Sequence, residues 1–199
     1  MKLDLFPIEV YHFKVPDHNQ IKEKYLPDII KNYEEGGFDK HKTNDWHTHS
    51  IHTSFNDENQ IIEKLPSSYS ELFDAVMPVK WQGKFTLWHN VYKKFEYQEI
   101  HHHIPSDFSA IHFLSFDKTE HNPPVFFDPA RLIKERLSYQ KIRPPTTIHI
   151  DVEEGDMIIF PSYLEHLVPA ASKEYKEYRV TVSINLTLTG IQNKSIMDI

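Results

Sequence analysis

Three histidines and one arginine in the second half of the chain have the types and spacing of a metal site beside an anion-binding group. His101 and His103 flank His102 in a run of three histidines, and His166 and Arg179 follow far along the chain. Side chains two residues apart on a strand share a face, so His101 and His103 point together and His102 points away. Three imidazoles bind a borderline metal such as iron and leave coordination positions open, which indicates a catalytic metal centre.

A fortuitous surface cluster is the alternative for the histidine run, because a single histidine on a strand is usually a core or surface residue. The combination of the run with His166 and Arg179 favours the metal hypothesis over that alternative.

The segment that begins at Arg179 carries polar side chains at alternate positions, including Thr181 and Ser183, which therefore share one strand face. Guanidinium groups bind carboxylates bidentately, so this face suits a small acidic cosubstrate. A lone arginine on a strand is often a solvated charge, but this one begins an otherwise apolar strand, which favours a binding role. Asn90 and Tyr92 also share a face, although a strand tyrosine is usually a packing residue.

Short strands must position these residues. The N-terminal part predicts a strand within 1–16, a helix over about 20–34 ending at the glycine pair 36–37, and a second helix over about 58–77. The remainder is β-branched or aromatic and divided by turn residues. It predicts strands over 79–92, 95–103, 108–116, 123–127, 146–151, 156–161 and 178–189, with a short helix or insertion over 129–141.

This order of elements predicts a mainly β fold, a jelly roll with N-terminal helices packed on one face. We expect a single domain over 1–199, in which 1–78 holds a strand and helices, 79–189 forms the β core and 190–199 is a tail.

Composition excludes several classes of protein. The net charge of −7 argues against a broad nucleic-acid surface, and no stretch is apolar enough to span a membrane. The chain has no cysteine, which excludes disulfides and thiolate ligands, and its first residues are too polar for a signal peptide. We therefore expect an intracellular, cytoplasmic protein.

Two stretches resemble a known superfamily. Residues 155–169, which include Phe160-Pro161 and His166, look like the distal motif of iron(II)- and 2-oxoglutarate-dependent oxygenases, and Arg179–Asn185 looks like their C-terminal strand. Asn90-Val91 before a His-x-His and the later Ser109-Ala110-Ile111 are similar to a branch found in phages and marine bacteria, itself similar to prolyl-hydroxylase-like enzymes. If a phage encodes the chain, as this resemblance allows, we expect it in the host cytoplasm.

The resemblance implies a double-stranded β-helix that uses iron(II), 2-oxoglutarate and O2. It implies hydroxylation of a peptidyl (first of all prolyl) or small-molecule substrate, with release of succinate and CO2. His101, His103 and His166 would be the metal ligands, and these with Arg179 the catalytic residues. The residues that hold 2-oxoglutarate would be Arg179, Thr181, Ser183, Tyr92 and Asn90.

The chain departs from the superfamily at one ligand. The usual triad is His-x-Asp/Glu with a distal histidine, whereas here His103 stands at the carboxylate position. Asp107 is a less favoured alternative ligand, since an aspartate in a turn commonly bonds the backbone instead.

Two other functions remain open. One is a cupin-like, three-histidine dioxygenase that uses no 2-oxoglutarate, and the other is a non-catalytic metal-binding jelly roll. Arg179 separates the first of these from the leading hypothesis, because only 2-oxoglutarate needs a carboxylate anchor. A further group, His47, His49 and His52, predicts a solvent-facing loop or lid, with a second metal site as the alternative.

Overall fold

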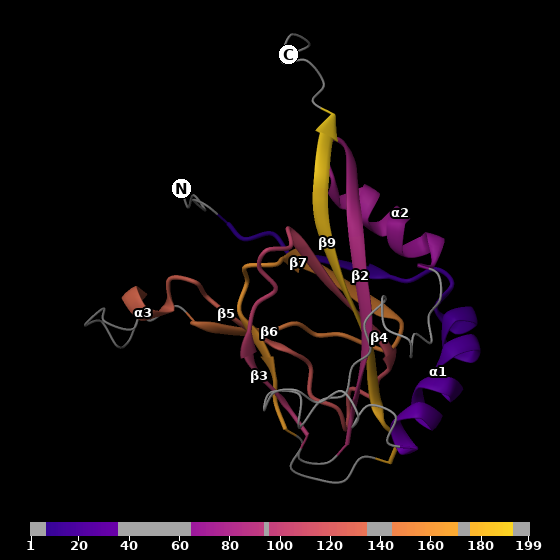
Figure 1. Ribbon diagram of the computed structural model, residues 1–199. Coiled ribbons are helices and arrows are strands. Elements are labelled where there is room, and N and C mark those ends of the chain that lie inside the picture. Colours follow the sequence, from indigo (N-terminus) through magenta and orange to yellow (C-terminus); the bar gives the residue numbers. More distant parts are fainter. Residues whose placement is uncertain (1–6, 36–64, 94–95, 135–144, 171–175, 193–199) are drawn as a thin grey trace.

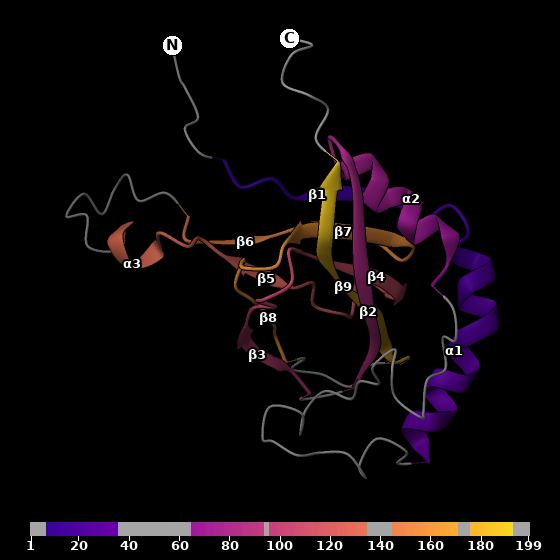
Figure 2. The same ribbon diagram turned by 45° about the horizontal axis from the view of Figure 1, so that its top comes forward.

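Two antiparallel sheets face each other in the computed structural model, which describes residues 7–35, 65–93, 96–134, 145–170 and 176–192. The larger sheet has the strand order β1-β7-β4-β9-β2, and the smaller has the order β3-β8-β5-β6. Most of these strands are labelled in Figure 1, and β1 and β8 are labelled in Figure 2. The predicted mainly β jelly roll is therefore confirmed. The larger sheet consists of β1 (Tyr11–Lys14), β2 (Lys80–Tyr92), β4 (Phe108–Ser115), β7 (Asp156–Pro161) and β9 (Arg179–Gln192). The smaller consists of β3 (Gln98–His101), β5 (Val125–Phe127), β6 (Thr147–His149) and β8 (His166–Val168).

Two helices, α1 (His18–Glu34) and α2 (Ser67–Val76), cover the outer face of the larger sheet (Figure 2). Ile21, Tyr25 and Ile29 of α1 recur at helical spacing and are buried, which gives the helix one apolar face. This packing confirms helices on one face of the fold. A third helix, α3 (Arg131–Lys134), is short and lies within the predicted 129–141 insertion. Residues 36–64, which include the glycine pair, the first part of the second predicted helix and His47, His49 and His52, lie outside the described residues.

Alternation along the central strands divides the interior into two cores. On β4, Ala110 and Leu114 face the helices, whereas Ile111 and Phe113 face the smaller sheet. On β9, the fully buried Val180, Val182, Ile184 and Leu186 belong to the helix side. Because neighbouring residues point to opposite faces, the polar residues between them are directed between the two sheets.

One strand was missing from the sequence prediction. His166 was expected to follow the strand at 156–161, but it begins a separate strand, β8, in the opposite sheet. Residues 162–165 turn the chain from β7 into β8, which pairs with both β3 and β5. Three residues are too few for a reliable alternation signal, and this is why the pattern gave no indication of β8.

The predicted strand over 95–103 is also shorter than expected. Strand β3 ends at His101, so His103 lies just beyond it and is held by a hydrogen bond from its backbone N–H to the Ser162 carbonyl (2.8 Å).

Among the described residues, no helix is long and apolar enough to cross a membrane.

Candidate metal centre and its cavity

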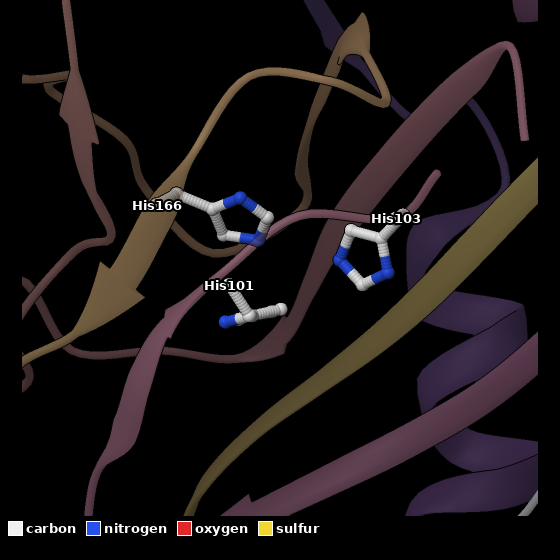
Figure 3. Close-up of side chains that lie close together, drawn as sticks. All are labelled: His101, His103 and His166. Atoms are coloured by element: carbon white, nitrogen blue, oxygen red, sulfur yellow. The ribbon is translucent and has the colours of Figure 1, made fainter. Parts of the chain in front are cut away.

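Three histidine rings from two distant parts of the chain converge between the two sheets. His101 ends β3, His166 begins β8 directly opposite it, and His103 follows β3 (Figure 3). One ring nitrogen of each lies within 4.8 Å of those of the other two. In the described part of the chain this is the only group of at least three potential His, Cys, Asp or Glu ligands so close together.

Backbone hydrogen bonds orient two of the rings. His101 Nδ1 lies 2.7 Å from the Glu99 carbonyl and His166 Nδ1 lies 3.0 Å from the Leu164 carbonyl. A carbonyl only accepts, so each Nδ1 carries the proton and each Nε2 keeps its lone pair. Such support from behind the ring is what metal-binding histidines generally have.

Burial keeps all three rings neutral. Loss of solvent lowers the pKa of His103 to about 3, with a further contribution from His101 and His102. Burial likewise lowers the pKa of His101, and it lowers the pKa of His166 well below its usual range. At neutral pH the three imidazoles therefore offer lone pairs and carry no positive charge. They can bind a divalent cation without electrostatic repulsion.

Arg179 lies in the same cavity as the histidines. It is 1% exposed, although it is a charged residue at the start of a strand. Its Nε–H donates to the Asn122 carbonyl (3.1 Å), and its guanidinium carbon lies 4.7 Å from the centre of the Tyr92 ring. A buried arginine on one side of three neutral histidines makes this cavity suitable for an anion that also reaches a metal.

The other predicted cosubstrate residues line this cavity because β2 and β9 are paired in register. Tyr92 lies opposite Arg179, Asn90 opposite Thr181, and Trp88 opposite Ser183. Side chains directly opposite each other share a face, so all six point inward. The cavity has a volume of about 90 Å³, which is enough space for several water molecules. It is lined by Trp88, Asn90, Tyr92, Gln98, His101, His103, Ile111, His166, Val168, Arg179, Thr181 and Ser183.

Asn90 and Tyr92 supply neutral polar groups to the cavity wall. The Asn90 amide donates to the Ser183 hydroxyl (2.9 Å), which fixes both side chains. Burial raises the pKa of Tyr92 to about 12 despite the opposing effect of Arg179, so the phenol keeps its proton.

His102 and Asp107, the two residues considered beside the predicted ligands, do not line the cavity. His102 is exposed, as alternation predicted, and its Nδ1 accepts the Ile104 N–H (3.3 Å). Asp107 is exposed too, and its carboxylate accepts the Leu188 N–H (2.7 Å) at the β4–β9 end of the larger sheet. The Asp107 carboxylate is thus used as a backbone acceptor, apart from the three histidines.

Gln98 is a cavity residue that the sequence analysis missed. It is 6% exposed and lies opposite Val168, while His101 lies opposite His166. The four residues 98–101 of β3 thus span only three of β8, 166–168, and the extra residue makes a β-bulge. Strict alternation would direct Gln98 and His101 to opposite faces, and only the bulge places both in the cavity.

The fold and the site now define a class. Residues 86–185 match the family described as "Putative 2OG-Fe(II) oxygenase". The match covers half of the chain and includes all the histidines and the arginine of the cavity, and the chain belongs to this 2-oxoglutarate–iron(II) oxygenase family. A search of curated proteins finds no match.

Solved structures share the fold at low sequence identity. A prolyl-4-hydroxylase from Pseudomonas putida superposes with a TM-score of 0.62 at 10% identity, covering 92% of this chain and 94% of its own. A prolyl hydroxylase from Trichoplax adhaerens, in complex with a hypoxia-inducible-factor peptide, gives 0.61 at 12%, covering 89% and 83%. HygX from Streptomyces hygroscopicus, with nickel and 2-oxoglutarate bound, gives 0.58 at 11%, covering 92% and 84%.

Proposed function

We propose that the protein is a hydroxylase that uses non-haem iron(II), 2-oxoglutarate and O2. In this proposal His101, His103 and His166 hold the metal, and Arg179 binds the distal carboxylate of 2-oxoglutarate. The observation that carries the proposal is the shared cavity, in which the three imidazoles and the buried guanidinium lie on the walls of one small space.

The histidines fit the metal by their donor chemistry. Imidazole nitrogen is a good ligand for iron(II), and the neutral rings need lose no proton to bind. Three ligands on one side of an octahedral ion leave three positions for other groups. Bound iron(II) would supply the oxidising chemistry, in which O2 and 2-oxoglutarate yield succinate, CO2 and a hydroxylated substrate.

The remaining cavity residues fit 2-oxoglutarate. The buried guanidinium of Arg179 would neutralise the distal carboxylate. Because water is excluded there, the attraction between the two charges would be strong. Thr181 and the Tyr92 phenol add hydroxyl donors, while the bonded pair Asn90 and Ser183 stiffens the wall beside them. Together these side chains hold the cosubstrate in one orientation and exclude bulk water from it.

A peptidyl substrate, with proline as the first candidate, is the choice that the fold neighbours support, and a small molecule is the alternative. His166 is buried, while His101 and His103 are only partly buried. The substrate would therefore approach from the side of these two rings.

A second candidate is a three-histidine dioxygenase that binds its substrate directly to the metal. The observation that favours it is the absence of a carboxylate from the histidine group in the described residues. It gives no role to a buried arginine in the same cavity, and this is why 2-oxoglutarate chemistry is the stronger proposal.

The test measures binding and turnover of 2-oxoglutarate in wild-type protein and in Arg179→Met, which keeps an apolar stem between Tyr92 and Phe116. Wild-type protein with iron(II) should form succinate, and with nickel(II) it should bind 2-oxoglutarate in calorimetry. Arg179→Met should weaken that binding by about 10- to 100-fold, the range for loss of a charged hydrogen bond. Nickel affinity should change little.

2-Oxovalerate is the matched control ligand, because it has the same chain length and 2-oxo acid group but a methyl group in place of the distal carboxylate. Its affinity should be the same for both proteins. Absence of succinate formation together with equal affinities for the two oxo acids would exclude 2-oxoglutarate as the cosubstrate and favour the three-histidine dioxygenase.

A further inference from the structure

A buried histidine outside the metal group, His121, lies next to the start of β9, the strand that carries Arg179. His121 is 3% exposed and belongs to the connection between β4 and β5. This connection passes beside the start of β9, where the Arg179 side chain lines the cavity.

Both ring nitrogens of His121 have defined backbone partners. Nδ1 accepts the Asp117 N–H (3.0 Å), and Nε2 lies 3.1 Å from the Glu177 carbonyl, to which it must donate. The ring is therefore the neutral tautomer with its proton on Nε2. Burial, which lowers the pKa of His121, favours the same neutral form. The ring thus ties the turn at Asp117 to the residue two positions before Arg179.

The residue after His121 contacts the anchor directly. The Asn122 carbonyl accepts the Arg179 Nε–H (3.1 Å). Phe116 gives a second connection, since its ring centre lies 5.6 Å from that of His121 and 5.8 Å from the Arg179 guanidinium carbon. Movement of the His121 ring would consequently displace both the Asn122 carbonyl, which accepts the Arg179 Nε–H, and the Phe116 ring beside the guanidinium.

The turn before His121 is itself well ordered by short-range bonds. The Asp117 carboxylate accepts the Thr119 N–H (2.8 Å), and the Asp117 carbonyl accepts the His121 N–H (2.7 Å). These bonds shape the turn locally, but none of them joins it to residues 176–178, which lead into β9. In the described residues around this turn, the His121 ring provides such a link from inside, and the Lys176 N–H to Glu120 bond (3.0 Å) provides one at the exposed surface.

We propose that His121 is a positioning residue that fixes the Arg179 guanidinium for the distal carboxylate of 2-oxoglutarate. It acts by holding the Asn122 carbonyl and the Phe116 ring in place, and it touches neither cosubstrate nor metal. This inference rests on the proposed function, because it assigns to Arg179 the carboxylate of 2-oxoglutarate.

Substitution of His121 should weaken the binding of the distal carboxylate of 2-oxoglutarate and leave the binding of the 2-oxo acid group and of the metal unchanged. His121→Phe keeps a ring against Phe116 and removes both hydrogen bonds, whereas His121→Gln can still donate to Glu177 and His121→Asn can still accept from Asp117. Measured by calorimetry on nickel-loaded full-length protein, His121→Phe should weaken 2-oxoglutarate binding about tenfold. His121→Gln and His121→Asn should lie between His121→Phe and wild type.

Affinity for 2-oxovalerate and for nickel(II) should stay within about twofold of wild type in all three variants. A merely structural role would lower affinity for both oxo acids together. His149→Gln, an exposed histidine on β6, is the matched control and should change nothing.

Equal losses for 2-oxoglutarate and 2-oxovalerate, or unchanged 2-oxoglutarate affinity in the His121 variants, would overturn the inference. If His121→Phe does not fold, the same comparison on the polar variant His121→Gln decides. Arg179→Met separates the two proposals: if it weakens 2-oxoglutarate binding while the His121 variants do not, only the positioning role fails. If Arg179→Met has no effect, the carboxylate anchor itself is wrong.

Discussion

The three histidines of the cavity form an uncharged donor set. Each ring is neutral because of burial, and two are oriented by carbonyls from behind. A metal held by three imidazoles keeps its full charge, whereas a carboxylate ligand would offset part of it. The proposed centre would therefore attract the anionic ends of a 2-oxo acid more strongly than one with a carboxylate ligand.

The neighbouring residues His102 and His103 allow a direct test of the proposed metal ligands. His103→Ala should lower nickel(II) affinity by at least about tenfold, because one of three ligands is lost. His102→Ala changes the exposed neighbour and should leave affinity unaltered, and so should Asp107→Asn. Calorimetric titration with nickel(II) measures all three. Loss of affinity in Asp107→Asn, with His103→Ala unchanged, would move the third ligand to the carboxylate.

At the scale of elements, the site depends on strands from both sheets, which supply its residues together. Strands β2 and β9 pair over their whole length and place the cavity wall that carries Arg179. The bulged β3, the residues just after it and the short β8 place the histidines. The long pair carries a close contact at Gly83, where a Cβ would come within 2.9 Å of the Thr187 carbonyl. A larger side chain there would separate the two strands.

The helices attach to the other face of the larger sheet through a buried polar chain. His112 on β4 hydrogen-bonds the Tyr69 hydroxyl of α2 (2.6 Å) through Nδ1 and His18 of α1 (3.0 Å) through Nε2. Both Tyr69 and His112 are fully buried. The chain therefore joins two helices to one strand at a place where water cannot substitute.

Removal of one hydroxyl should show what this attachment contributes. Tyr69→Phe leaves a buried histidine nitrogen without its partner, and it should lower the free energy of unfolding by about 1–3 kcal/mol. Urea denaturation measures that change. Because His112 faces away from the cavity, nickel(II) and 2-oxoglutarate affinities of the folded variant should equal those of wild type. A change in either affinity would show that the helix layer influences the site.

For the whole molecule, buried neutral histidines make stability depend on pH. Burial lowers the pKa of His112 to about 3, whereas an unfolded histidine has a pKa of about 6.5. Between these values the unfolded chain binds a proton that the folded chain does not. The stability is thus fully present above about pH 6.5 and is lost as the pH falls toward about 3.

Urea denaturation of metal-free protein between about pH 7.5 and 4.5 tests this. The free energy of unfolding should fall by about 1.4 kcal/mol per pH unit for each such histidine once the pH is well below 6.5. His112→Gln removes one titrating group, so its curve should be less steep by about that amount. Parallel curves for the two proteins would show that His112 does not titrate on unfolding.

Sequence alone determined the fold class and most of the candidate site, because those features follow from local pattern and residue chemistry. Alternation predicted most of the strands, the outward direction of His102 and the shared face of Arg179, Thr181 and Ser183, and these appear in the structure. It gave no sign of β8, and β3 ends before His103. The metal and cosubstrate roles of these residues remain predictions.

Tertiary structure decided what alternation cannot encode. Only strand pairing placed His166 on β8 opposite His101, and only the bulge in β3 brought Gln98 to the same cavity. Only the contacts of the β4–β5 connection joined His121 to Glu177 and Asn122 to Arg179. Each depends on residues far apart in the chain. Their positions follow from register and burial, which a short segment does not specify on its own.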